Sequence, residues 1–187
     1  MSGRLRGYTL IELCVTLGIV FILLNLGLPS YSALLARQQS QVEVERLNRA
    51  ISIARHTAVN EGRMTTLCRS SDGFQCGGQW QQGYIVFTDH NGDRQINGTD
   101  RLVEVFPALS RGVSLRYRAF QNKQYLQMTP AGFTNYQNGN FTFCPDSKDP
   151  ALAQQLIVNR AGRTYLARDL DGDGIREGAN GKPISCD

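Results

Sequence analysis

The sequence predicts an α+β protein in which a long N-terminal α-helix, membrane-inserted over its first half, packs against a C-terminal antiparallel β-rich head. Three observations support this fold class. A charge-free apolar run covers residues 13–28, an amphipathic helical pattern continues to residue 60, and short apolar runs between Gly-, Asn- and Asp-rich breaks follow. With 187 residues, one apolar segment and one globular domain are the natural division.

The apolar run is the first predicted element. Together with residues 8–12 it reaches the roughly 20 residues that cross a bilayer core. Arg4 and Arg6 precede it, which predicts a cytoplasmic N-terminus and places everything after Pro29 outside the inner membrane. A basic start and an apolar core are also typical of a cleavable secretory signal, but no small-x-small cleavage site follows.

Glu12 lies at the start of this apolar segment. An ionised carboxylate within hydrocarbon costs about 2.5–3.5 kcal/mol, so a segment that served only as an anchor would avoid it. We therefore expect Glu12 to have a partner.

The amphipathic part is the second element. Leu47, Ile51, Ala54 and Ala58 follow one another at steps of four, three and four, which predicts one buried helical stripe. Gly62 fits a C-terminal glycine cap. We predict one helix over residues 8–60, bent near the proline at position 29. It divides into a transmembrane and assembly part, 8–29, and an amphipathic part, 30–61, that packs on the head, 62–187.

The head is predicted to contain strands separated by turn clusters. Their apolar runs cover residues 64–69, 80–88, 101–106, 113–117, 125–128, 140–144, 156–159 and 164–169.

Four cysteines follow the apolar segment. An even number in an exported domain favours disulfides, and four cysteines allow three pairings. We predict Cys68–Cys76, which closes a short glycine-containing loop, and Cys144–Cys186, which ties down the C-terminus. A zinc site is the alternative, but the chain has no Cys-x-x-Cys pair and only two histidines.

The N-terminal segment GYTLIEL, with its basic leader, the apolar run and the proline, resembles the N-terminus of type IV pilins and pseudopilins. The resemblance implies a pilin fold and a prepilin leader over residues 1–7. It implies that a prepilin peptidase cuts between Gly7 and Tyr8 and methylates the new amine of Tyr8, although phenylalanine is commoner there in the family. It also implies a partner for Glu12, the N-terminal amine of a neighbouring subunit in the fibre, which would recover much of the burial cost.

The head segment WQQGYIVFTDHNGD, residues 80–93, and the later Ala161-Gly162-Arg163 resemble minor pseudopilins of the GspH/FimT type. The resemblance implies a minor pilin that primes pilus assembly and lies near the fibre tip. Its implied partners are other pilins and minor pilins, the prepilin peptidase and the inner membrane. Before assembly the chain would be a single-pass protein of the bacterial inner membrane with its head in the periplasm, and afterwards part of a pilus at the cell surface. The alternative is a minor pseudopilin of a type II secretion system.

Asp169, Asp171, Asp173 and Gly174 match the first half of a calcium-binding loop, D-x-D-x-D-G. The twelfth position, where such loops have a bidentate glutamate, is Asn180. Aspartates in this spacing also form turns by bonding their own backbone, and we expect turns here.

Asp89, Asn91 and Asp93 form a second, weaker version of the same pattern. Arg94 replaces the glycine of the sixth position, and Asp100 occupies the twelfth. Turns are again the expected structure, with calcium as the alternative.

DNA binding is the alternative function from a different class, because some FimT-type relatives bind DNA through a GRxR element. Gly162 and Arg163 match that element, whereas Tyr165 replaces its second arginine, and Arg160 and Arg168 could substitute for it. On a strand, Arg163 and Tyr165 share a face, and a cation beside a stacking ring suits single strands. An ordinary exposed hairpin explains the same residues.

An enzyme is not expected. The chain contains no G-x-S-x-G or H-E-x-x-H pattern and no phosphate-binding glycine loop between a strand and a helix. Its net charge of +4, to which Arg4 and Arg6 contribute, is too small to predict nucleic-acid binding by itself.

Overall fold

The computed structural model describes residue 7 and residues 9–186, without the side chains of residues 25–30, 32 and 33. The expected leader, apart from Gly7, and the expected methylation site Tyr8 lie outside the described residues. The chain divides into two compact units, residues 1–35 and 36–187. The domain boundaries expected from the sequence, at 29/30 and 61/62, stay predictions.

Helix α1 covers Leu10–Glu61 and continues through both units. It begins after Thr9, whose hydroxyl accepts the backbone N–H of Glu12 at 3.3 Å, as an N-cap residue does. It ends at Gly62, which has a φ of 64°, and there the backbone N–H of Arg63 donates to the carbonyl of Ala58. The long helix predicted over residues 8–60 is confirmed to within two residues at each end. The predicted bend stays a prediction.

The large apolar side chains of residues 10–24 are exposed, from 49% at Val20 to 81% at Leu10. Among the described residues, no helix combines the length and the apolar character that crossing a membrane requires. The structure therefore does not confirm the membrane-spanning segment expected over residues 8–29.

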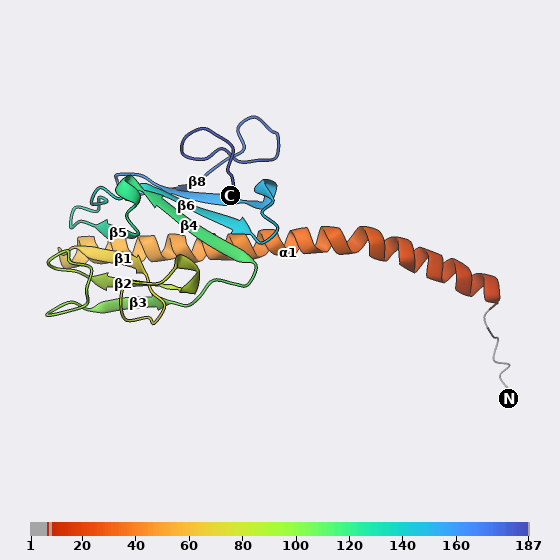
Figure 1. The fold of residues 1–187 in the computed structure, drawn as a ribbon, viewed down its shortest axis with the longest axis horizontal. Helices are drawn as coiled ribbons and strands as arrows, with labels where there is room; N and C mark the ends of the chain where they lie inside the picture. The colour runs from red at the N-terminus through yellow and green to blue at the C-terminus, as the bar shows by residue number, and fades with distance from the viewer. Residues whose placement is uncertain (1–6, 8, 187) are drawn as a thin grey trace. The chain divides into compact units, whose positions relative to one another are not determined.

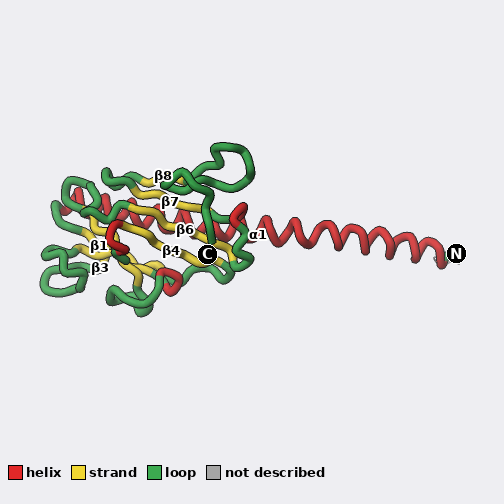
Figure 2. Tube along the Cα trace, turned by 45° about the horizontal axis from the view of Figure 1, so that its top comes forward, coloured by secondary structure: helices red, strands yellow, loops and turns green. Residues whose placement is uncertain are grey.

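The head contains two four-stranded antiparallel sheets (Figure 1). One has the order β3-β2-β1-β5 and the other β4-β6-β7-β8, and Figure 2 shows the second sheet's strands side by side. The strands are β1 Thr65–Arg69, β2 Tyr84–Thr88, β3 Leu102–Phe106, β4 Val113–Ala119, β5 Tyr125–Met128, β6 Gly139–Pro145, β7 Gln154–Val158 and β8 Thr164–Leu166. The described part of the chain also forms three short 3-10 helices, η1 Trp80–Gln82, η2 Phe120–Asn122 and η3 Pro150–Leu152. The antiparallel β-rich head is confirmed.

Two strand predictions were too long by three residues or more. Trp80–Gln82 is a 3-10 turn, because Gln79 and Gln82 cap it reciprocally and Gly83 then turns the chain at a φ of 127°. A side chain on Gly83 would approach the carbonyl oxygen of Phe106 to 2.7 Å, so only glycine fits there. Strand β8 ends at residue 166 and not at 169, because the chain beyond it turns to pair residue 168 with residue 177.

The main core lies between the C-terminal part of α1 and the inner faces of both sheets. The predicted helical stripe is buried, and its small residues at positions 50, 54 and 58 let the strands approach the helix closely. The lone Trp80, 2% exposed, packs edge-on against Tyr117 and Phe141.

Each sheet also buries part of its outer face, and a disulfide lies in each of these smaller cores. Cys68–Cys76 ties the loop after β1 to the outer face of the first sheet. Cys144–Cys186 ties the C-terminal segment to the outer face of the second, where Ile184 is also buried. These are the two pairs expected from the sequence.

Candidate functional site

The N-terminal site comprises the expected cleavage position and the acidic residue after it. Gly7 is exposed and has open space around it, as a peptidase substrate requires. Glu12 is exposed and lies in the first turn of α1, three residues after its N-cap Thr9. A carboxylate there interacts favourably with the helix dipole. The roles of Gly7, Tyr8 and Glu12 in processing and assembly stay predictions.

A second candidate site is the loop after β2, residues 89–100, which begins with a fully buried carboxylate. Asp89 is 0% exposed. Its Oδ2 accepts the hydroxyl of Thr66 at 2.6 Å, the amide of Gln127 at 3.1 Å and the backbone N–H of Arg94 at 3.2 Å. These bonds join the loop to β1 and β5. No described residue donates to the other oxygen, Oδ1, which is also buried.

Two further carboxylates of this loop lie beside Asp89. One carboxylate oxygen from each of Asp89, Asp93 and Asp100 lies within 4.8 Å of the other two. Asp100 accepts the backbone N–H and Nδ1 of His90 at 3.0 and 2.9 Å. Burial opposes ionisation of Asp100, but its bonds from His90 and Asn97 outweigh this and lower its pKa. Bonds to Asp93, above all from the Asn97 side chain, lower the pKa of Asp93 as well.

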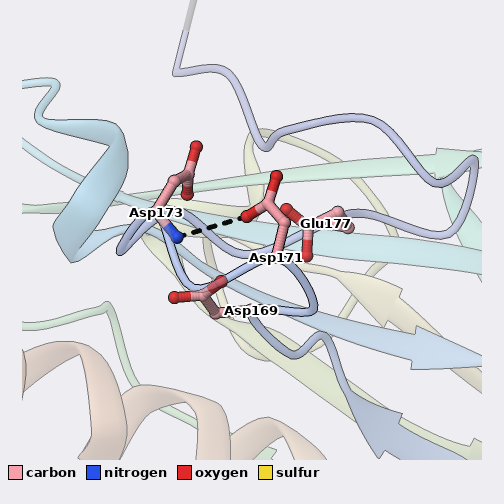
Figure 3. A group of neighbouring side chains, drawn as sticks. All are labelled: Asp169, Asp171, Asp173 and Glu177. Atoms are coloured by element: carbon pink, nitrogen blue, oxygen red, sulfur yellow. Dashed lines mark hydrogen bonds between the residues drawn. The ribbon is translucent and has the colours of Figure 1, made fainter.

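A third candidate site is the C-terminal acidic loop (Figure 3). Carboxylate oxygens of Asp169, Asp171, Asp173 and Glu177 lie within 4.8 Å of one another, and the three aspartates are exposed. Each aspartate accepts a nearby backbone N–H, such as that of Asp173 by Asp171 at 3.2 Å. These bonds are those of the expected turns. Calcium binding by Asp169, Asp171 and Asp173 was the alternative to those turns, and it stays untested.

The structure places the expected DNA-binding residues around β8. Arg163 precedes the strand, Tyr165 lies within it and is 52% exposed, and Arg168 follows it opposite Glu177. The guanidinium of Arg160 lies 5.6 Å from the centre of the Tyr136 ring. Only Arg163 among these four lines the surface hollow described next.

That hollow, of about 870 Å³, lies between α1 and the turn before β8. We call it the basic hollow, because Arg49, Arg55 and His56 of the helix line it together with Arg163. Arg55 is held in place by its bond to the carbonyl of Gly132 at 3.0 Å, and Arg49 also pairs with Glu104 at 3.1 Å. Sequence patterns alone missed these helix residues, since they are distant from Arg163 along the chain.

Comparison with known proteins identifies the family. The family model of the type II transport protein GspH matches residues 43–162. The chain belongs to the GspH family. This match begins on the buried part of α1 and includes all the strands up to β7, so GspH membership rests on the head and on the part of α1 that packs against it.

Solved structures share the fold. The type IV minor pilin FimU of Pseudomonas aeruginosa has a TM-score of 0.55 at 18% identity, over 79% of this chain and 99% of FimU. The minor pseudopilin EpsH of the Vibrio cholerae type 2 secretion system has a TM-score of 0.51 at 9% identity, over 68% and 95%. The predicted α+β pilin fold is thus confirmed. No curated protein matches the chain.

Proposed function

We propose that this GspH-family chain is a minor pilin, a structural subunit of a type IV pilus that is incorporated near the fibre tip and supports pilus assembly. The exposed apolar surface of residues 10–24, on a chain whose head buries its own core, carries the proposal. Contiguous apolar surface of this kind requires a partner. Lipid of the bacterial inner membrane fills this role before assembly, with the head in the periplasm, and helices of other pilins fill it in the fibre.

Processing and Glu12 complete the proposal. Prepilin peptidase cuts after Gly7. The cut leaves Tyr8 as the new N-terminal residue, and its amine is then methylated. Glu12 is the described acidic residue nearest to that end of α1, and it becomes surrounded by apolar helices once the subunit assembles. Pairing with the amine of a neighbouring subunit offsets the cost of burying its charge.

The test compares two Glu→Ala variants on the same helix. E12A should be cleaved normally, giving a mature chain that begins at Tyr8 by mass spectrometry. Its incorporation into sheared fibres should fall by at least about tenfold, the factor that 1.4 kcal/mol represents. E45A removes an exposed carboxylate from the head part of α1 and should assemble normally. Wild-type incorporation of E12A, or a native chain that retains its encoded Met1, contradicts the proposal.

A type II secretion pseudopilin is the second candidate, and the printed description of the matching family, a type II transport protein, favours it. The same subunit chemistry would then serve a secretion system. Deletion of the gene distinguishes the two, because loss of surface pili with normal protein secretion supports the pilus. The opposite result supports the secretion system.

DNA uptake is the third candidate, favoured by the basic hollow. Single-stranded DNA binding can be measured by fluorescence anisotropy at low salt, with the full chain in nonionic detergent. R163Q should weaken binding several-fold and reduce its salt dependence, whereas R160Q, outside the basic hollow, should not. Absence of binding, or equal effects of the two variants, rejects this candidate.

A further inference from the structure

The inference begins from the incomplete bonding of Asp89. Its side chain is fully buried, and three donors converge on Oδ2 while none of the described residues donates to Oδ1. A buried carboxylate oxygen without a partner is unfavourable, and more so when the group is charged. Asp89 therefore lacks one interaction that would complete its environment.

The surroundings of Asp89 are acidic. Asp93 and Asp100 each place a carboxylate oxygen within 4.8 Å, and the Asp100 side chain is only 2% exposed. Among the described basic groups of the loop, His90 bonds to Asp100, and the guanidinium of Arg94 lies 5.0 Å from the centre of the Tyr125 ring. Neither donates to Oδ1 of Asp89. Ionised carboxylates this close repel each other, and a cation between them would offset that repulsion.

We propose that Asp89, Asp93 and Asp100 bind one calcium ion, with Oδ1 of Asp89 as the buried ligand. Calcium prefers carboxylate oxygens and tolerates irregular coordination, whereas magnesium requires a near-ideal octahedron and retains its waters. These three aspartates occupy the first, fifth and twelfth positions of a calcium-type loop. Arg94 at the sixth position has a φ of 66°, the left-handed conformation for which such loops use glycine.

The C-terminal acidic loop provides an internal comparison. It repeats the backbone bonding, since Asp169 accepts the N–H of residue 174 as Asp89 accepts that of residue 94. Glu177 also has one buried oxygen without a described donor, but Asp169, Asp171 and Asp173 are exposed, so water can solvate them. Only the loop of residues 89–100 combines the pattern with a fully buried acid. The buried carboxyl group of Asp89, with its unpartnered oxygen, assigns the ion to that loop.

Binding there would stabilise the first sheet. Asp89 is bonded to Thr66 on β1 and Gln127 on β5, and Ile96 of the same loop packs over the Cys68–Cys76 core. The ion would hold the loop closed over this core, and its binding free energy would add to the stability of the head.

The experiment uses the full chain in nonionic detergent after removal of metals with EDTA. Calcium chloride is titrated by calorimetry, and thermal unfolding is followed through Trp80. Calcium at 100 times its dissociation constant should raise Tm by about 5–10 °C, and magnesium chloride at the same concentration should raise it less.

Two matched variants locate the site. D93N and D173N each change the fifth position of one loop, and each Asn oxygen can still accept the backbone N–H two residues later. D93N should weaken calcium binding at least about tenfold, as expected when a charged ligand is lost, and D173N should bind like wild type. If circular dichroism shows that D93N does not fold, D100N takes its place with the same expected loss.

Three results overturn the proposal. The first is no calorimetric signal and no change in Tm up to about 10 mM calcium, above the range of extracellular calcium modules. The second is weaker binding in D173N together with normal binding in D93N, which would move the site to the C-terminal loop. The third is an equal increase in Tm with magnesium, which would remove the assignment to calcium.

Discussion

The two disulfides should contribute unequally to stability, because they close loops of different length. Cys144 and Cys186 are 42 residues apart, and Cys68 and Cys76 are 8 apart. Loop-closure entropy then gives about 4 kcal/mol for the longer loop and about 2.5 kcal/mol for the shorter. We expect C144A/C186A to lower the free energy of unfolding by about 4 kcal/mol and C68A/C76A by about 2.5 kcal/mol.

The contacts of the C-terminal segment support this estimate. The backbone N–H of Ile184 donates to the carbonyl of Arg176 at 2.9 Å, and the Arg116 side chain donates to the carbonyl of Ser185 at 3.0 Å. Ile184 is also buried. These contacts remain in C144A/C186A, so most of the loss should come from the unfolded chain. The denaturant slope m should therefore rise, because the chain without the disulfide is more expanded when unfolded.

Trp80 provides the assay. It is the only tryptophan, is 2% exposed, and packs between the sheets. Its fluorescence should follow urea unfolding of the full chain in nonionic detergent, with both double variants measured beside wild type. The entropy argument is refuted if C68A/C76A loses more stability than C144A/C186A, or if neither loses more than about 1 kcal/mol, the loss that an average point mutation causes.

The combined loss has a functional consequence. About 6–7 kcal/mol is comparable to the whole stability of a typical domain, 5–15 kcal/mol. The reduced head should be marginal or unfolded, so it should reach its final stability only where disulfides form. That requirement agrees with the periplasmic location proposed above for the head.

Two other predictions test the core and a tight turn. Burial raises the pKa of Tyr84 to about 12, from about 10 in the unfolded chain. The contribution of Tyr84 to the free energy of unfolding is therefore complete below pH 10. It falls by about 2–3 kcal/mol between pH 10 and 12, because the unfolded chain loses the tyrosine proton first. Urea midpoints against pH should show this fall, and an equally steep fall in Y84F contradicts it. A Cβ on Gly162 would lie 2.5 Å from the carbonyl oxygen of Gly132 at a φ of 68°, so G162A should cost at least about 3 kcal/mol. G172A, with a φ of 81° and open space, should cost about 1–2 kcal/mol by the same urea assay, and equal losses refute the clash.

Local sequence patterns predicted the elements in which buried and exposed residues recur at a regular spacing. The steps of four, three and four at Leu47, Ile51, Ala54 and Ala58 fix one helical face, and all four residues are buried. The N-terminal segment and the residues 80–93 predicted the family that the GspH match shows. Trp80–Gln82 was assigned wrongly to a strand, since the close approach of Phe106 at Gly83 comes from a strand distant in sequence.

The two acidic loops show why a sequence motif alone could not decide which of them is the better candidate for calcium binding. By sequence the C-terminal loop is the better calcium motif, because it has glycine at the sixth position where the other has Arg94. The spacing of a motif shows how many oxygen atoms could bind a metal ion. The free energy of binding also depends on what solvates those oxygen atoms in the absence of the ion. Asp89 is buried because Thr66 and Gln127, from two other strands, enclose its carboxylate, and nothing within residues 89–100 encodes those neighbours. The preference for the loop of residues 89–100 therefore belongs to the calcium proposal above and depends on burial, which the motif does not encode. Arg94 adopts the left-handed conformation at the sixth position despite its side chain.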